Sequence, residues 1–150
     1  MATYSPRQLY DLARSVGLDH QDSIVAAAIA LGESGGRTNA VGDTALQGPT
    51  WGPSIGLWQI RSLRRDAGTG RARDATKLTD PRFNARAMYQ ISSGGRSWTP
   101  WTVYTSGAYR RYLPAVQRAA SGSSGGAGTG DAGLTLPGPM APYGPLLPGP

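Results

Sequence analysis

Apolar positions recur at helical spacing in four stretches of the chain, and each stretch carries a start or stop signal. The first, about residues 6–16, follows Ser5-Pro6, which pairs a capping residue with a proline suited to the first helical position. Another begins at Asp80-Pro81 and runs to about residue 93. The last covers about 108–120, where Pro114 is expected to bend the helix. The pattern predicts a mainly helical domain.

The second stretch, which begins near Asp19, is the most apolar of the four. Ile24, Ala28 and Leu31 recur at helical spacing, and small apolar residues fill most positions between them. Because apolar side chains nearly surround this helix, we expect it to be buried. Glycines at 32, 35 and 36 are expected to end it, which leaves Glu33 at its C-terminal edge.

Two regions of the chain do not have helical spacing. Residues 35–55 are rich in Gly, Thr, Asn, Asp and Pro and precede a short apolar segment at 56–60, which predicts an irregular or β-hairpin insertion in an α+β domain. After residue 120 the composition changes. We therefore expect a domain at 1–120, a Gly/Ser-rich linker at 121–136 and a Pro-rich, disordered or extended tail at 137–150.

Charge and composition narrow the possible chemistry. The net charge is +6, and six cations fall between Arg61 and Lys77, which suits either a polyanionic partner or a solvated loop. No nucleic-acid motif accompanies them, so no nucleic-acid partner is expected.

The chain has no cysteine and a single histidine, and we expect neither a metal nor a cofactor. No apolar run approaches the roughly 20 residues of a membrane span, and no secretory signal is recognisable, so delivery by another route is expected.

Glu33 is the only glutamate in the chain. Cleavage of a glycosidic bond requires a carboxylic acid that is still protonated near neutral pH. A helix C-terminus and apolar neighbours would both raise the pKa of a carboxyl group above its usual value of about 4.3. Position alone favours the other interpretation, an ordinary solvated residue at a helix end.

Three short motifs favour a catalytic role for Glu33 over that of a solvated surface residue. Glu33-Ser34, the segment Gly56-Leu57-Trp58-Gln59-Ile60 and the segment Tyr104-Thr105-Ser106-Gly107 resemble, in order, the three motifs of the soluble lytic transglycosylase family. Asn39-Ala40 and Leu78-Thr79-Asp80-Pro81, with Asn84-Ala85 after it, also resemble family positions. The resemblance covers about residues 22–118 and implies a lysozyme-like fold.

The resemblance implies a role for each matching residue. Glu33 would be the catalytic acid/base, oriented by the Tyr104 hydroxyl, while Ser34 would support the carboxyl or the glycan. Gln59 would contact the N-acetyl region of the sugar. Thr105 stands where the family usually has Asn, which puts that substrate contact in doubt.

The tryptophans are further candidates for sugar contacts, because their faces pack on sugar rings. Trp51 and Trp58 are expected to face the cleft. Trp98 and Trp101 are expected to lie at least partly in the core, although Trp101 is also a candidate for substrate binding.

The predicted activity is cleavage of peptidoglycan glycan strands by lytic transglycosylation, which forms a 1,6-anhydro product without water. The alternative is a hydrolytic muramidase, for which Asp43 would be the second carboxylate, although Gly42-Asp43 also reads as a simple turn. A third possibility is a catalytically silent wall-binding or structural protein.

The small domain with a low-complexity tail is similar to wall-degrading proteins of bacteriophages, either virion-associated or released at the host wall. The tail could then bind a tail or baseplate protein.

Overall fold

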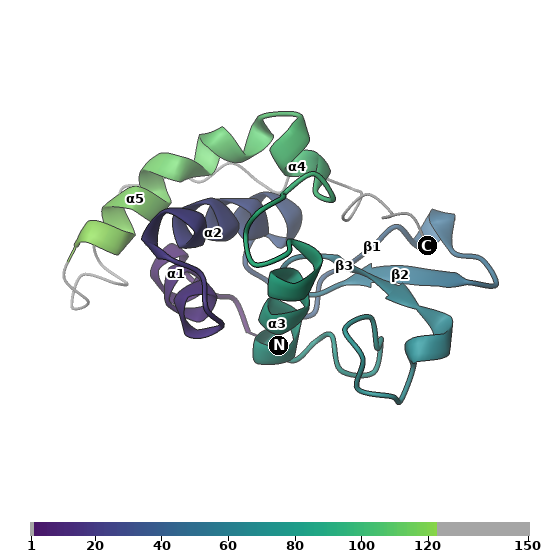
Figure 1. Cartoon of the computed structure of the whole chain (residues 1–150). Coiled ribbons are helices and arrows are strands. Elements are labelled where there is room, and N and C mark those ends of the chain that lie inside the picture. The colour runs from purple at the N-terminus through teal and green to yellow at the C-terminus, as the bar shows by residue number, and fades with distance from the viewer. Residues whose placement is uncertain (1, 123–150) are drawn as a thin grey trace.

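The computed structural model describes residues 2–122, and the predicted linker and Pro-rich tail lie outside the described residues apart from their first two positions. Figure 1 shows a helical part on one side and a small sheet on the other, so the predicted mainly helical α+β fold is confirmed. None of the helices in this part of the chain is long and apolar enough to cross a membrane. The helices and strands, with their bounds, are α1 Pro6–Ser15, α2 His20–Ser34, β1 Val41–Gly42, β2 Trp51–Ile55, β3 Ile60–Leu63, α3 Pro81–Ile91, α4 Thr102–Thr105 and α5 Leu113–Ser121, with 3-10 helices η1 Thr44–Leu46, η2 Arg64–Asp66 and η3 Ala108–Tyr112.

Helix α2 forms the centre of the helical part, as its apolar sequence predicted. It packs against α1, α4, α5 and η3, and its residues from Ala26 to Ser34 are all buried. Gly32 does not end the helix, contrary to expectation. A Cβ atom there would lie 2.7 Å from the side chain of Val103, so glycine at this position allows α4 to approach closely. The helix ends instead at Gly35, which adopts the left-handed conformation.

The predicted helix starts are confirmed by their caps. The Ser5 hydroxyl accepts a hydrogen bond from the Gln8 backbone N–H, and the Gln8 side chain accepts one from Ser5 in return. At the starts of α2 and α3, Asp19 and Asp80 accept a hydrogen bond from the backbone N–H of Asp22 and Phe83, without the reciprocal bond. Each cap satisfies backbone donors that a helix N-terminus leaves without partners.

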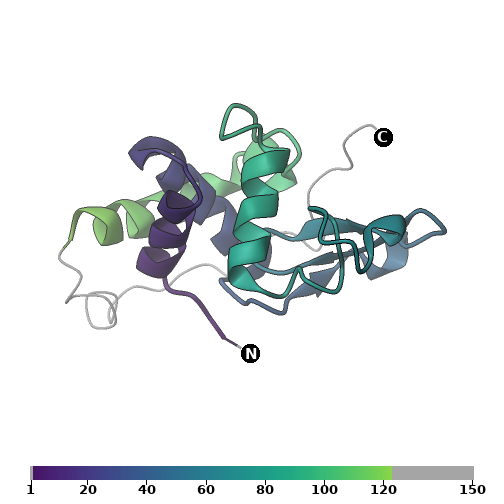
Figure 2. The same cartoon turned by 60° about the horizontal axis from the view of Figure 1, so that its bottom comes forward.

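The three strands form an antiparallel sheet in the order β1-β2-β3. Ile55 pairs with Ile60 across the turn that joins β2 to β3. Asn84 of α3 stabilises this turn, because its amide donates to the carbonyls of Ile55 and Leu78 and accepts from the Trp58 N–H. Figures 1 and 2 both show α3 between the helical part and the sheet.

The predicted last helix is divided into η3 and α5. Pro114 lies in the first turn of α5, where the missing N–H costs no hydrogen bond, so it starts a new helix and does not bend a continuous one. The Arg7 side chain of α1 donates to the carbonyls of Ala119, Ala120 and Gly122. This contact ties the end of α5 to the start of the domain.

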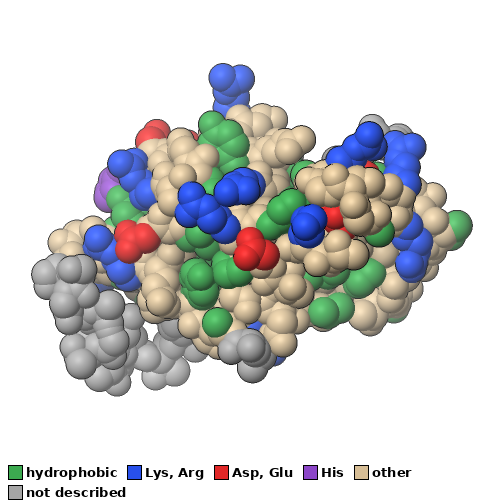
Figure 3. Space-filling view, turned by 90° about the horizontal axis from the view of Figure 1, so that it is seen from below, with side chains coloured by type: hydrophobic (Ala, Val, Ile, Leu, Met, Phe, Trp, Pro, Cys, Tyr) green, Lys and Arg blue, Asp and Glu red, His purple; other side chains and the backbone are tan. Residues whose placement is uncertain are grey.

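Much of the basic run between Arg61 and Lys77 has a structural role. Arg61 is buried and donates to the carbonyls of Gly52 and Leu46, and Arg73 donates to the Arg61 carbonyl. Burial lowers the pKa of Arg73 from its usual value. These arginines connect loops of the sheet region, so only part of the run remains as surface charge. Other cations are spread over the surface, and on the face in Figure 3 Lys and Arg side chains clearly outnumber acidic ones.

Candidate active site

The Glu33 carboxyl group lies in the last turn of α2, where the helical part meets the sheet side of the molecule. Its side chain is almost fully buried, with a relative exposure of 3%. Neither carboxyl oxygen has a hydrogen-bond partner of normal geometry among the described residues. A buried polar group without a partner is costly and therefore uncommon outside functional sites. The geometry identifies Glu33 as the leading candidate for chemistry.

The surroundings of Glu33 raise its pKa from 4.5 to about 9. Burial is the largest cause, because the charged form loses its hydration, and the negative charge of Asp43 adds to the effect. The backbone N–H of Val103, in α4, offsets part of the rise. At neutral pH Glu33 therefore carries a proton that it can donate, which is the state that a general acid requires.

Asp43 is a buried carboxyl group on the sheet side of the same site. It follows β1 with a φ of 57°, a left-handed conformation that aspartate tolerates better than most residues, and its relative exposure is 6%. The Ser54 hydroxyl of β2 donates to Asp43 Oδ2 at 2.5 Å. Because Asp43 also influences the pKa of Glu33, it is more than a solvated turn residue.

Gln59 lies in the turn between β2 and β3, on the same side as Asp43. Its φ of 46° is unusual for a residue with a side chain, and its amide nitrogen donates to the carbonyls of Ala40 and Gly56. These bonds hold the side chain in one orientation, which agrees with a positioned binding residue. The Oε1 atom accepts no hydrogen bond from the described residues, so it is the atom that could bind a sugar N-acetyl N–H.

Two predicted contacts around Glu33 are not seen. The Ser34 hydroxyl donates to the Ala30 carbonyl and accepts from the Gly36 N–H, so Ser34 shapes the end of α2 and does not contact the carboxyl. Tyr104 forms no hydrogen bond with Glu33; its ring stacks on Tyr109 with 4.8 Å between centroids. Thr105 is exposed on α4 and remains able to contact a ligand.

The prediction that Trp58 faces the cleft is wrong. The side chain is fully buried, and its indole N–H donates to the Ala26 carbonyl of α2. Trp101 is also fully buried and donates to the Trp58 carbonyl, so its place in the core is confirmed and its candidacy for substrate binding is not supported. Trp51 is only partly buried, and the Arg73 guanidinium lies 5.3 Å from its ring centre. It is therefore the tryptophan that stays available for a sugar.

Sequence reasoning missed two residues that shape the site. The Val103 N–H acts on Glu33 from α4, a helix of four residues that has no recognisable sequence signal. Asn84 positions the backbone on both sides of Gly56 and was noted only as part of a family-like segment. Within residues 2–122, no group of His, Cys, Asp and Glu side chains could hold a metal ion.

Comparison with known proteins decides the family. The sequence model of a family described as "Lysozyme like domain" matches residues 10–103, which is well over half of the chain. The chain belongs to this lysozyme-like family. The match includes Glu33, Asp43 and Gln59 and ends directly before Tyr104, the start of the third motif. Searches of curated proteins and of solved structures found no match.

Membership of the lysozyme-like family agrees with the site. A helical domain with a small sheet places a buried, protonated glutamate between its two parts, next to a second carboxyl group. The family and the site together support an enzyme that cleaves peptidoglycan. The type of cleavage depends on what happens after Glu33 gives up its proton.

Proposed function

We propose that this lysozyme-like domain cleaves the glycan strands of bacterial peptidoglycan by lytic transglycosylation, with Glu33 as both acid and base. The observation that carries the proposal is the pKa of about 9 for a buried Glu33 carboxyl that accepts no hydrogen bond of normal geometry from residues 2–122. The neutral form donates its proton to the oxygen of the leaving sugar. The N-acetyl group of the muramic acid would stabilise the anomeric carbon as the bond breaks.

The same pKa supports the second half of the reaction. A carboxylate with a raised pKa is a stronger base than an ordinary one, so ionised Glu33 can take the proton of the muramic acid 6-hydroxyl. That oxygen then bonds to the anomeric carbon and forms the 1,6-anhydro ring, while the proton returns to Glu33. In this scheme Asp43 acts through its charge, by keeping the pKa of Glu33 high.

A hydrolytic muramidase is the second candidate, and the burial of Asp43 favours it. A second carboxylate near the acid could hold a water molecule for attack on the anomeric carbon. The two reactions differ in their products: a transglycosylase releases anhydro-sugars, whereas a hydrolase releases reducing ends. Mass spectrometry of the fragments from purified peptidoglycan tests the proposal directly, and reducing ends alone would reject it.

Asp43→Asn separates the two roles of Asp43. If Asp43 acts through its charge, its removal lowers the pKa of Glu33, and the alkaline limb of the pH–activity profile moves to lower pH while anhydro products persist. The measurement is product release by wild type and variant between pH 5 and 10, which should differ little at the acid end. A near-complete loss of activity at every pH would instead indicate that Asp43 holds the nucleophilic water. Ser54→Ala, which removes only the hydroxyl donor to Asp43, serves as the milder control.

The biological setting that we propose is a bacteriophage particle or a phage enzyme released at the host wall. The support is the sequence alone: a small wall-degrading domain followed by Gly/Ser-rich and Pro-rich segments. Such a tail would connect the enzyme to a tail or baseplate protein.

A chain that ends at Gly122 tests this arrangement. It retains every carbonyl that Arg7 contacts on α5, so we expect wild-type cleavage of purified peptidoglycan and an unchanged melting temperature. Incorporation into particles or complexes should fall. Loss of catalysis with an intact fold would show that the tail is part of the active enzyme.

A further inference from the structure

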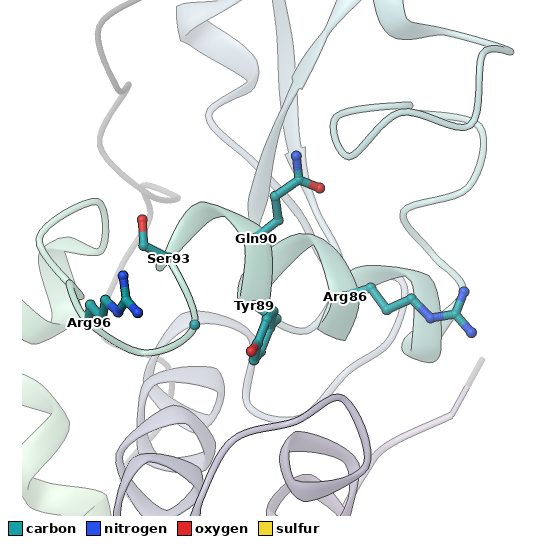
Figure 4. A pocket seen from close by; sticks show the side chains of 6 residues that line it. Arg86, Tyr89, Gln90, Ser93 and Arg96 are labelled. Atoms are coloured by element: carbon teal, nitrogen blue, oxygen red, sulfur yellow. The ribbon is translucent and has the colours of Figure 1, made fainter.

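The outer face of α3 carries a row of exposed polar side chains. Arg86, Tyr89 and Gln90 are three and four residues apart on α3, so they lie on one side of the helix, and Ser93 follows in the turn after it. Together with Gly94 and Arg96 they line an open cavity of about 580 Å³. Figure 4 shows Arg86 and Arg96 at opposite ends of this row, with Gln90 and Ser93 between them. We call it the α3 groove.

A rigid turn places the second arginine. Ser93, Gly94 and Gly95 have successive φ angles of 54°, 70° and 88°. Their N–H groups donate to the Gln90 carbonyl, the Tyr89 carbonyl and the Ser92 hydroxyl. Since the backbone is held at each of these positions, Arg96 projects from a defined point.

The charge of the groove is uncompensated by the described residues. Neither Arg86 nor Arg96 forms an ion pair or a hydrogen bond with them, unlike Arg61 and Arg73 of the basic run. No acidic side chain lines the cavity. Asp22 of α2 lies against Gly95, next to the groove, and pairs with neither arginine.

The chemistry of the groove suits a chain of phosphate groups. A guanidinium binds phosphate through paired hydrogen bonds, and two of them at the ends of a groove match charges that repeat along a polymer. The amide of Gln90 and the hydroxyls of Tyr89 and Ser93 add neutral hydrogen-bonding groups between them. Proteins that bind single-stranded nucleic acid usually stack its bases on aromatic rings in addition to contacting phosphates. Tyr89 is the one aromatic residue among those that line the cavity, and an edge of its ring lies against Gly17 and Gly94, so the groove favours a phosphate polymer without bases.

We propose that the α3 groove binds a polyol-phosphate polymer of the bacterial cell surface and holds the enzyme at the wall. The groove is separate from the catalytic carboxyl group. Asp22, which borders it, precedes Glu33 by eleven residues on α2, and at 1.5 Å per residue this places them roughly 16 Å apart. A polymer bound in the groove therefore does not need to contact Glu33.

The test compares two double variants of the full chain. Arg86→Gln/Arg96→Gln removes both cations of the groove, and Arg65→Gln/Arg118→Gln removes two exposed arginines on η2 and α5, away from the groove, so both variants have the same net charge. The probe is a synthetic poly(glycerol phosphate) of defined length, and its affinity is measured by titration calorimetry over a series of salt concentrations. We expect the groove variant to bind at least about tenfold more weakly. The slope of log affinity against log salt should fall by between about 1 and 2.

Two further comparisons make the result decisive. A single-stranded oligonucleotide with the same number of phosphates should bind wild type more weakly than the polyol phosphate. Peptidoglycan stripped of phosphate polymers should be cleaved equally by wild type and the groove variant, whereas intact walls should be cleaved more slowly by the variant. Absence of polymer binding by wild type, equal weakening in the control variant, or equal affinity for the oligonucleotide would each overturn the proposal.

Discussion

Glu33→Gln is expected to reduce the cleavage of peptidoglycan by about a hundred- to ten-thousand-fold, the usual contribution of general acid/base catalysis. The amide keeps the shape of the side chain but has no proton to donate at neutral pH. Release of soluble fragments from purified peptidoglycan measures the effect. Activity within a few-fold of wild type would show that Glu33 is not the catalytic acid/base, and it would contradict both proposed reactions.

The same substitution should stabilise the fold at neutral pH. Folding raises the pKa of Glu33 from 4.5 to about 9, so the native state retains a proton that the unfolded chain releases. The contribution of Glu33 to stability is therefore fully present below about pH 4.5 and is lost as the pH rises toward 9. A glutamine does not titrate, so the melting temperature of the variant should exceed that of wild type at pH 7 and approach it at pH 4. A gain of this kind together with lost activity is the usual sign of a strained active site.

Trp58→Ala is expected to have the largest effect on stability, about 3–5 kcal/mol in the free energy of unfolding. The indole ring is fully buried between α2 and the sheet region, and its removal leaves a cavity and an Ala26 carbonyl without its donor. Urea unfolding followed by circular dichroism gives the measurement. Trp58→Phe, which keeps an aromatic ring but loses the N–H, should cost less.

Trp51→Ala is the matched control, since this ring is only partly buried on β2. We expect a change in unfolding free energy of about 1 kcal/mol, near the size of its contact with Arg73. If Trp58→Ala left stability unchanged and raised only the KM for peptidoglycan, then Trp58 would face the sugar after all.

Local signals in the sequence determined most of the helical framework. The caps at Ser5, Asp19 and Asp80 were predictable because a capping side chain bonds to backbone only a few residues away. The burial of α2 followed from apolar residues on every side of one helix, and the candidacy of Glu33 followed from its place at the end of that helix and from motif order. The caps and the burial of α2 depend on short sequence separations or on composition, whereas the motif order depends on resemblance to a family.

Contacts between distant segments were decided only by the tertiary structure. Trp58 follows a glycine and a leucine in a short apolar segment, and nothing local distinguishes an aromatic ring that meets a sugar from one that meets Ala26, 32 residues earlier. The sequence predicted that Gly32 ends α2, whereas in the structure a side chain at this position would clash with Val103 of α4. Likewise, the pKa of Glu33 depends on its burial, on Asp43 from the sheet side and on Val103 from α4. Desolvation and charge act through space and not along the chain. The pKa of Glu33 is therefore raised only when folding brings the helical part and the sheet together.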